Sequence, residues 1–589
     1  MRKFLKYTLA VIVGSVVSIF LLILGVVIIV GIFSAASQQE VTVKDNSVLV
    51  LEFDGPVVDR TTEDPFSDAL SELIGQSAPV GLNHILASIE KAGRDDRIKG
   101  IYLEPGLIMA GHATIEEIRD ALEDFKESGK FIISFGPVYS QKAYHLASVA
   151  DKVYLNPEGM LDFQGLTSQR TFFKNTLEKL GVDIQIIRHG DYKSAVEPFT
   201  RTNMSDAARE QTKTYVNSLW NHITANVADS RDVTPEALNE TADQMPLFKN
   251  GDFLMRANLI DGLKYKDEVI KELKDSTQTD YKDDINSIGL KKYKNAYVPD
   301  ENKGISKNKI AVIYANGEID GTDREGILSD ELSRTIRKAR RDTTIEAVVF
   351  RINSPGGSAL GSEIIWREVQ LTAEAKPLIV SMGDVAASGG YYIACAADSI
   401  VAQPNTITGS IGVFGMVPNV DGLMEKIGIT TDKVTTNKFS DMPSLDRALT
   451  SEEKDLMQAY VENTYDVFLQ RCADGRNTTK AAIDSIGEGR VWSGEDAFEL
   501  KLVDKLGSIQ DAIDIAAGMA EIEDYRTVPM PEILPPFEQL MKDMTGNASA
   551  YVRNLFPGSS EEMKFLKTIE NLKEGYPIQA RMPYELKID

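Results

Sequence analysis

The segment Ser134-Phe-Gly-Pro-Val-Tyr-Ser-Gln-Lys-Ala-Tyr144 matches Ser381-Met-Gly-Asp-Val-Ala-Ala-Ser-Gly-Gly-Tyr391 without gaps, at an offset of 247 residues. When the comparison is continued over 32 positions, nine of them are identical. Repetition at a fixed offset indicates that one structural unit is present twice. The sequence therefore predicts a tandem duplication, with a first repeat over residues 46–290 and a second repeat over residues 308–520.

Each repeat alternates short apolar runs with helical patterns. Ala347-Val-Val-Phe350 and Pro377-Leu-Ile-Val380 are typical of buried parallel strands, and residues 328–339 have the spacing of an amphipathic helix. This alternation predicts an α/β fold. A polar stretch over residues 265–307 joins the repeats, and a proline-interrupted C-terminal extension over residues 521–589 follows them, with no visible chemistry.

Composition excludes several classes of protein. The chain has 589 residues, with 64 Lys and Arg against 88 Asp and Glu, and a net charge of −24 argues against nucleic-acid binding. Cys395 and Cys472 are too few for a disulfide-rich scaffold or a thiolate zinc site, and we expect no metal and no cofactor. The second repeat contains no histidine, since the five of the chain are His84, His112, His145, His189 and His222.

The N-terminus carries a candidate membrane anchor. Residues 9–33 contain no charge and are long enough to cross a hydrocarbon core of about 30 Å. Three cations lie within residues 1–8, and the body beyond is acidic, which predicts a cytoplasmic N-terminus and an extracytoplasmic body. The alternative is a cleavable signal peptide, because residues 34–37 are small.

Ser388 is the candidate nucleophile. It stands between a predicted strand and a small-residue helix, where a serine can simply be a helix N-cap. The loop Asn353-Ser-Pro-Gly-Gly357 also follows a strand and can direct backbone N–H groups at a developing oxyanion. The first repeat has Gln141 at the position of Ser388 and lacks the glycine pair. This joint loss favours a catalytic role for the second repeat.

A serine nucleophile needs a base, and the second repeat offers no histidine. The first repeat contains Lys193, and the residue 247 positions later is Ser440. A lysine acts as a base only when its pKa is lowered, and the interface between two repeats could provide the necessary burial. Lys438, which we expect on the same strand face as Ser440, is the competing base. Ser410, in Gly409-Ser-Ile-Gly412, could orient the lysine amine and help to keep it neutral.

These segments resemble the signal peptide peptidase A (protease IV) family in its long two-repeat form. The resemblance rests on five ordered motifs, which are Asp191-Tyr-Lys-Ser-Ala-Val-Glu-Pro-Phe199, Asn353-Ser-Pro-Gly-Gly357, Ala386-Ala-Ser-Gly-Gly-Tyr391, Gly409-Ser-Ile-Gly412 and Val491-Trp-Ser-Gly494. It implies two units of the ClpP/crotonase fold and a serine peptidase with a Ser-Lys dyad. Ser388 would be the nucleophile and Lys193 the general base. Gly357 and Gly389 would supply the oxyanion N–H groups, and Ser410 would bind the lysine.

The resemblance also implies the cellular setting. Members are anchored in the plasma membrane and cleave remnant signal peptides and other apolar peptides. They form a dome-like homo-oligomer, here suspected to be a tetramer, with apolar grooves. The sequence does not decide whether Lys193 meets Ser388 of its own chain or of a neighbouring chain.

Two other functions compete with a peptidase. A crotonase-type acyl-CoA enzyme would use the oxyanion site without Ser388, but an extracytoplasmic body argues against coenzyme A as a substrate. A catalytically inert membrane scaffold would need none of the candidate residues. Because the nucleophile, the glycine loop and the lysine are all present, we favour the peptidase.

Overall fold

The structure of the chain is a computed structural model. It describes residues 41–53, 55–61, 77–298, 306–321, 326–532 and 578–581, with the isolated positions 14, 18 and 25. Apart from these three positions, the predicted N-terminal tail and membrane segment lie outside the described residues. Within the described part of the chain, no helix is long and apolar enough to cross a membrane.

The first repeat is built on a sheet of six parallel strands. In spatial order they are β8 (Gly262–Leu263), β6 (Lys152–Leu161), β5 (Phe131–Tyr139), β4 (Ile98–Glu104), β1 (Ser47–Glu52) and β9 (Ser287–Gly289). Two short strands, β2 (Val57–Val58) and β3 (Val80–Gly81), pair with each other.

Helices cover both faces of this sheet. One face shares a large core with α3 (Leu82–Arg94), α4 (His112–Lys126), α5 (Gln141–Ala147), α9 (Pro235–Ala242), α10 (Gly251–Arg256) and α12 (Leu290–Tyr293). The other face is covered by α11 (Lys266–Thr277), through Val269 and Leu273. The polar stretch that joins the repeats in the sequence thus contributes helices and an edge strand to the first repeat.

The second repeat has the same strand order. Its strands are β18 (Lys505–Leu506), β14 (Ser399–Ala402), β13 (Leu378–Ala387), β11 (Ile345–Ser354), β10 (Lys309–Asn316) and β19 (Arg526–Met530), all parallel. The carboxyl end of β13 extends past its pairing with β14 and pairs there with β15 (Ile407–Gly409). In turn, β15 pairs antiparallel with β17 (Val491–Ser493). The edge strand β19 lies beyond residue 520, so part of the predicted C-terminal extension belongs to this sheet.

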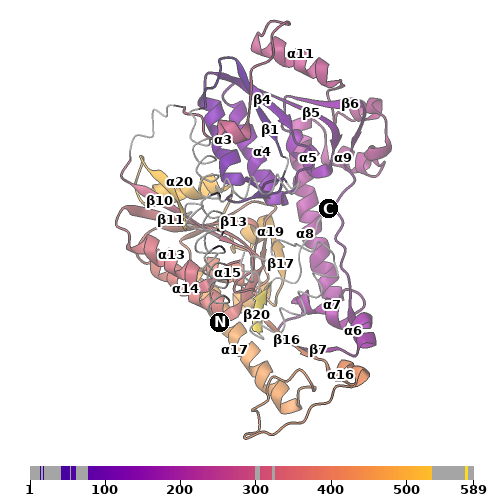
Figure 1. Cartoon of the computed structure of the whole chain (residues 1–589), viewed down its shortest axis with the longest axis vertical. Coiled ribbons are helices and arrows are strands. Elements are labelled where there is room, and N and C mark those ends of the chain that lie inside the picture. The colour runs from indigo at the N-terminus through magenta and orange to yellow at the C-terminus, as the bar shows by residue number, and fades with distance from the viewer. Residues whose placement is uncertain are drawn as a thin grey trace, which may run out of the picture.

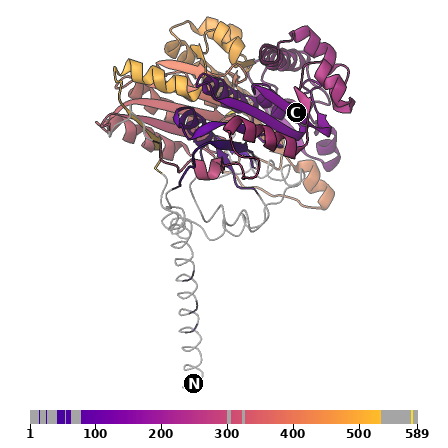
Figure 2. The ribbon, with the colours of Figure 1, turned by 90° about the horizontal axis from the view of Figure 1, so that it is seen from above.

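Successive side chains of the central strands point to opposite faces of the sheet, and each face has its own hydrophobic core. Val348 and Phe350 of β11 enter the larger one, whereas Ala347 and Val349 pack against α20 (Ile509–Met519) on the opposite face. The helices of the larger core are α13 (Ser329–Arg341), α14 (Ala359–Ala373), α15 (Gly389–Ala394), α17 (Ser451–Gly475), α18 (Lys480–Ile486) and α19 (Gly494–Glu499). Figure 2 shows α20, in yellow-orange, next to an indigo helix of the first repeat.

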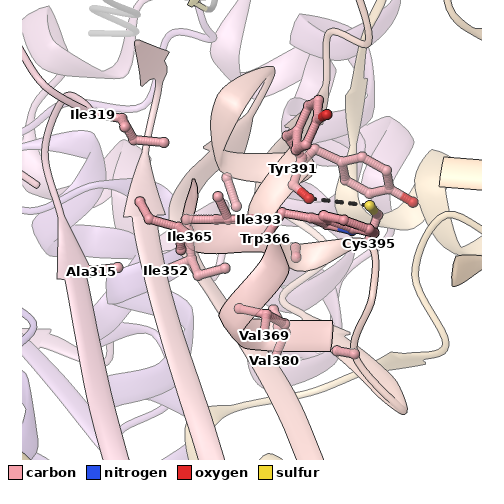
Figure 3. Close-up of a cluster of buried hydrophobic side chains, with 14 of the residues drawn as sticks. Ala315, Ile319, Ile352, Ile365, Trp366, Val369, Val380, Tyr391, Ile393 and Cys395 are labelled. Atoms are coloured by element: carbon pink, nitrogen blue, oxygen red, sulfur yellow. Dashed lines mark hydrogen bonds between the residues drawn. The ribbon is translucent and has the colours of Figure 1, made fainter. Parts of the chain in front are cut away.

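The short helix α15 is held firmly in this core. Ile393 and Tyr391 pack among Ile365 and Trp366 of α14 and Ile352 of β11, as Figure 3 shows. Cys395 is fully buried there and its Sγ donates to the carbonyl oxygen of Tyr392 at 3.1 Å, as Figure 3 also shows. The helix that begins directly after Ser388 therefore has a fixed position.

Residues 183–231 of the first repeat extend across to the second repeat. The strand β7 (Asp183–Arg188) pairs antiparallel with β16 (Phe414–Asn419) over six residue pairs. The helix α8 (Asp206–Arg231) is 26 residues long, about 39 Å, and contacts β17 near its start and the first-repeat core near its end. Figure 1 shows α8 running between the two repeats, with α6 (Lys174–Leu180), α7 (Glu197–Thr200) and α16 (Asp421–Ile427) near β7.

Candidate active site

Ser388 occupies a strained turn between β13 and α15. Its φ is 55° and its ψ is −113°, a backbone conformation that a residue with a side chain rarely adopts. Such strain costs about 1–3 kcal/mol and persists only where the surroundings enforce it. The Ser388 N–H donates to the carbonyl oxygen of Gly409 at 2.8 Å, which ties the turn to the end of β15.

The side chain of Ser388 does not cap α15. In the first repeat the equivalent helix α5 begins in the ordinary way, with Ser140 at a φ of −68° accepting from the N–H of Ala143. Gln141 is the first residue of that helix and makes no strained turn. The N-cap interpretation of Ser388 is therefore wrong, and its hydroxyl is left available for another partner.

That partner is Lys193 of the same chain. Its Nζ lies 2.8 Å from Ser388 Oγ, 3.0 Å from Ser410 Oγ and 3.1 Å from the Ser410 carbonyl oxygen. All three residues are fully buried. A neutral amine has two hydrogens and one lone pair, so it can donate to both Ser410 oxygens and accept the Ser388 hydroxyl hydrogen. Lys193 therefore contacts Ser388 within one chain.

Burial lowers the pKa of Lys193 well below its ordinary value of 10.5. Ion pairs found in the described part of the chain do not include this lysine, so no carboxylate offsets the loss of hydration. Water stabilises an ammonium ion much more than an amine, and its removal favours the amine. Lys193 thus meets the electrostatic requirement for a base.

Ser410 is the second residue that contacts the amine of Lys193. Its φ is 50°, and its N–H donates to the carbonyl oxygen of Arg490 at 2.6 Å. Its Oγ donates to the carbonyl oxygen of Gly489 at 3.2 Å, so it meets Lys193 as an acceptor. Acceptors stabilise an ammonium more than an amine. Ser410 is therefore placed to orient Lys193, while burial is what favours the neutral form.

The glycine loop lies beside the turn of Ser388. Gly357 belongs to β12 (Gly356–Ser358) and has a φ of 153°, and an added Cβ would lie 2.2 Å from the carbonyl oxygen of Ile319. Gly389 is the first residue of α15, where N–H groups have no acceptor within the helix. The two expected oxyanion donors thus belong to elements that flank Ser388.

Gly489 closes the side of the site that holds Lys193. A Cβ at this position would lie 2.6 Å from the Lys193 Cβ and 2.7 Å from its backbone nitrogen. The φ of Gly489 is 83°, which favours glycine in any case. The sequence analysis did not identify this residue, although it closely precedes the Val491-Trp-Ser-Gly494 motif.

Gln211 of α8 fixes the segment that carries Lys193. Its Nε2 donates to the carbonyl oxygen of Tyr192 at 2.9 Å and to Ser194 Oγ at 3.1 Å, and its Oε1 accepts from the N–H of Val491 at 3.1 Å. Gln211 is fully buried. The sequence analysis missed it, yet a glutamine within the stripe that includes Ala208, Tyr215 and Leu219 is a signal that could have indicated its role.

Asp59 connects the first repeat to the strand that leads into the glycine loop. It accepts from Arg351 Nε at 2.6 Å and from Asn353 Nδ2 at 2.9 Å. Arg351 also lies 2.6 Å from Glu117 and donates to the carbonyl oxygen of Met382 at 3.2 Å. The sequence analysis did not find this cluster, because Asp59 lies more than 290 residues before its two partners in the second repeat.

Thr114 of α4 supports the strand that ends at Ser388. Its Oγ1 donates to Asp384 Oδ2 at 2.7 Å and its N–H donates to Asp384 Oδ1 at 2.9 Å. Asp384 stands four residues before Ser388 on β13. The first repeat therefore braces both active-site strands of the second repeat.

Lys438, the competing base, lies elsewhere. It pairs with Glu452 on the surface and its side chain is 65% exposed. The expected strand around Ser440 is absent, since residues 438–441 form a turn.

His189, the histidine nearest to Lys193 in the chain, stacks on Tyr465 with ring centroids 4.1 Å apart. Among the described residues, no group of three or more histidine, cysteine or acidic side chains is arranged for a metal ion.

Two repeated parallel α/β sheets, with a buried serine in a strained strand-to-helix turn and an amine beside it, define a class of serine hydrolase. The model of peptidase family S49 matches residues 124–280 and 370–523, one segment in each repeat. The chain belongs to this family and is a serine peptidase.

Relatives over most of the chain agree with this assignment. "Protease 4" of Haemophilus influenzae is 36% identical over 498 residues, covering 82% of this chain and 81% of that protein. "Protease 4" of Salmonella typhi is 35% identical, covering 92% and 89%. "Serine protease SPPA, chloroplastic" of Arabidopsis thaliana is 31% identical, covering 90% and 77%.

Among solved structures, a mutant of ClpP1 from Listeria monocytogenes matches 34% of this chain and 94% of that chain. The identity is 14% and the TM-score is 0.24, which is too low to establish a shared fold. The ClpP/crotonase fold therefore stays a prediction from the resemblance, whereas the duplicated α/β architecture is a property of the structure.

Proposed function

We propose that Ser388 and Lys193 form the catalytic dyad of this serine peptidase. The observation that carries the proposal is the 2.8 Å contact between Lys193 Nζ and Ser388 Oγ, with both residues buried. A lowered pKa of the lysine supports it, because a general base must be unprotonated at the working pH.

The reaction would proceed through an acyl-enzyme. Lys193 takes the Ser388 hydroxyl proton as Oγ attacks the scissile carbonyl carbon, and the N–H groups of Gly357 and Gly389 receive the oxyanion. The Lys193 ammonium then gives its proton to the leaving amine as the peptide bond breaks. Water attacks the ester with Lys193 again as the base, and Ser388 is regenerated. Ser410 holds the amine in line throughout.

The setting we propose is the membrane. Residues 9–33 would anchor the chain in the plasma membrane, with residues 1–8 in the cytoplasm and the catalytic body on the extracytoplasmic side. The substrates would be remnant signal peptides and other apolar peptides, and the enzyme would act as a homo-oligomer, suspected to be a tetramer. Externally added protease should digest the body in right-side-out spheroplasts, and protection of the body would overturn this topology.

A serine-directed fluorophosphonate probe tests the chemistry. It should label Ser388 in the full chain and fail to label Ser388→Ala, while Lys438→Ala is labelled normally. An acyl-CoA enzyme or an inert scaffold would not be labelled at this serine. Absence of label on a folded full chain would therefore refute the dyad.

A further inference from the structure

A cleft with a volume of about 500 Å³ lies between the two repeats. One wall is formed by α3 and α4 of the first repeat, and the other by α20, β10 and β19 of the second repeat. Figure 1 shows α20, in yellow-orange, close to α3, in indigo. The described residues that line the cleft do not include Ser388, Lys193 or Ser410. The cleft is therefore separate from the candidate active site, and its volume is in the range of small-molecule sites.

Much of the lining of this cleft is apolar, and both repeats contribute to it. The first repeat supplies Leu86 and Phe125, and the second repeat supplies Val312, Ile509 and Ile513. Of these side chains, Phe125, Val312 and Ile513 are buried. An apolar body placed among them would lose its contact with water, which is favourable. The cleft therefore suits a ligand with an apolar body of modest size.

The charged groups that line the cleft do not balance. Five of them are carboxylates and two are guanidinium groups, from Asp59, Glu90, Glu117, Asp120 and Asp124 and from Arg94 and Arg351. Arg351 is paired at 2.6 Å with both Asp59 and Glu117. Arg94 is paired with Glu90 at 3.3 Å. The two cations are thus already engaged, and Asp120 and Asp124 belong to no ion pair among the described residues.

Asp120 has an amide as its hydrogen-bond partner and no cation. Its Oδ2 accepts from Gln403 Nε2 of the second repeat at 2.8 Å. Besides the groups that line the cleft, its charged neighbours are Glu116, Glu123 and Arg119, all on α4, and Arg119 is paired with Glu123. Burial, followed by the charge of Glu116, raises the pKa of Asp120 to about 7. A cation placed beside this carboxylate would stabilise its ionised form.

Asp124 lies one turn after Asp120 on α4. Burial and the charges of three acidic neighbours, Glu127, Asp511 and Glu123, raise its pKa. Asp511 belongs to α20, so the second repeat adds negative charge from the opposite wall. The cleft therefore combines an apolar lining with an end that is negative and lacks a cation.

We propose that this cleft binds a small organic cation, with an ammonium group at Asp120 and Asp124 and an apolar body against Phe125 and Ile513. The proposal does not depend on the proposed function of the dyad. A ligand in this position contacts both repeats, so its binding stabilises their docked arrangement. It also lies beside Asp59, through which the first repeat braces the strand that leads into the glycine loop.

Calorimetric titration of the full chain tests the chemistry of the ligand. The probes are 2-phenylethylamine, 2-phenylethanol and 3-phenylpropionate, which share a phenyl body and differ in charge. At about pH 8 the amine should bind at least about tenfold more tightly than the alcohol, and the acid should not bind. Equal binding of the amine and the alcohol, or no binding of the amine, would overturn the proposal.

Variants locate the site. Asp120→Asn can still accept from Gln403 Nε2 but carries no charge, so it should weaken binding of the amine by about tenfold or more and leave binding of the alcohol unchanged. Asp243→Asn removes the same charge at an exposed position outside the cleft and should change neither. Ser388→Ala should bind the amine as the unmodified chain does. Loss of binding in Ser388→Ala would place the amine at the dyad and refute the cleft as its site.

The pH dependence of binding supplies a second readout. Between about pH 6 and 8 the amine probe stays protonated, since aliphatic ammonium groups have pKa values of about 10. Its affinity for the unmodified chain should rise over this range, because Asp120 loses its proton near pH 7. Asp120→Asn should abolish this rise. The same rise and the same affinity in Asp120→Asn as in the unmodified chain would show that the amine does not bind at Asp120.

Discussion

The two repeats share a strand order but differ directly after the equivalent strands β5 and β13. In the second repeat this strand, β13, is followed by Ser388, in a strained turn that places its hydroxyl beside Lys193. In the first repeat Ser140 caps the following helix, and the Gln141 side chain accepts from the N–H groups of Gln164 and Gly165. One architecture thus supports either a reactive turn or a relaxed one, and the difference lies in a few residues.

The first repeat has nevertheless kept a part in the site. It supplies Lys193, and it braces the second repeat through Asp59 and Thr114. The first repeat has no serine at the position of Ser388, and its residues position the serine of the second repeat. Five experiments, described in order of decreasing effect, would break or sharpen this comparison.

The largest contrast should be between the equivalent positions 388 and 141. Ser388→Ala should lower kcat/KM for an apolar peptide ester by about 10⁴-fold or more, because it removes the nucleophile. Gln141→Ala should retain activity within about twofold, because the amide makes only hydrogen bonds within its own repeat. A strong loss of activity in a folded Gln141→Ala protein would show that the first repeat takes part in the chemistry.

Replacement of Lys193 should be nearly as damaging to catalysis but favourable to stability. Lys193→Met should lower kcat/KM to a similar degree, and the double variant with Ser388→Ala should be hardly worse than either single one. Since the folded pKa lies below 10.5, folding at lower pH must remove a proton or bury a charge.

Methionine has no proton to lose and no charge to bury, so Lys193→Met should unfold at higher denaturant concentration than the unmodified chain. The gain should shrink by about 1.4 kcal/mol per pH unit as the pH rises from the folded pKa toward 10.5. Chemical unfolding at several pH values measures it. A gain that stays constant with pH below 10.5 would mean that Lys193 is charged in the folded protein.

The pH–rate profile reports the same group. Below the folded pKa of Lys193, kcat/KM should rise about tenfold per pH unit, because only the amine accepts the serine proton. Burial should place the midpoint well below 10.5. Lys438→Ala should leave both the midpoint and the rate unchanged, and a shifted midpoint in that variant would return the role of base to the second repeat.

The bracing contacts should have a moderate effect. Thr114→Val removes the hydroxyl that donates to Asp384 Oδ2 and should lower kcat by roughly tenfold, with KM nearly unchanged. Thr114→Ser keeps the hydroxyl and should restore kcat. If valine and serine give the same kcat, α4 does not position the turn of Ser388.

The smallest effect concerns stability alone. Gln141→Ala should lower the free energy of unfolding by about 1–3 kcal/mol, because the N–H groups of Gln164 and Gly165 lose their acceptor. Differential scanning calorimetry of the full chain measures the change. An unaltered unfolding temperature would show that water replaces the amide without penalty.

Much of this architecture could be predicted because the evidence for it is local. Apolar runs bounded by helical patterns identified the strands, and the offset between the Ser134 and Ser381 segments revealed the duplication. The motifs that contain Ser388, Lys193, Gly357 and Ser410 were recognisable one by one, and membership of the S49 family is confirmed. The catalytic roles of these residues stay predictions until the variants are measured.

Other features depend on distant parts of the chain. Lys438 and Lys193 were both plausible bases by spacing, but only the pairing of β7 with β16 decided that Lys193 reaches Ser388. Residues beyond 520 gave no chemical signal, yet they contribute the edge strand β19 and the strand β20 (Ile578–Arg581), which pairs with β12 and β16.

The sequence by itself determined the duplication, the α/β class and the candidate residues, because periodicity and motif spacing depend only on the order of residues in the chain. Only the tertiary structure decided the burial of Lys193, the partners of Asp59 and Thr114, and the place of β20. The physical reason is that burial and hydrogen bonding depend on what surrounds a group in space. Folding removes the water around Lys193, which lowers its pKa, and brings the hydroxyl oxygen of Ser388 within 2.8 Å of its amine nitrogen.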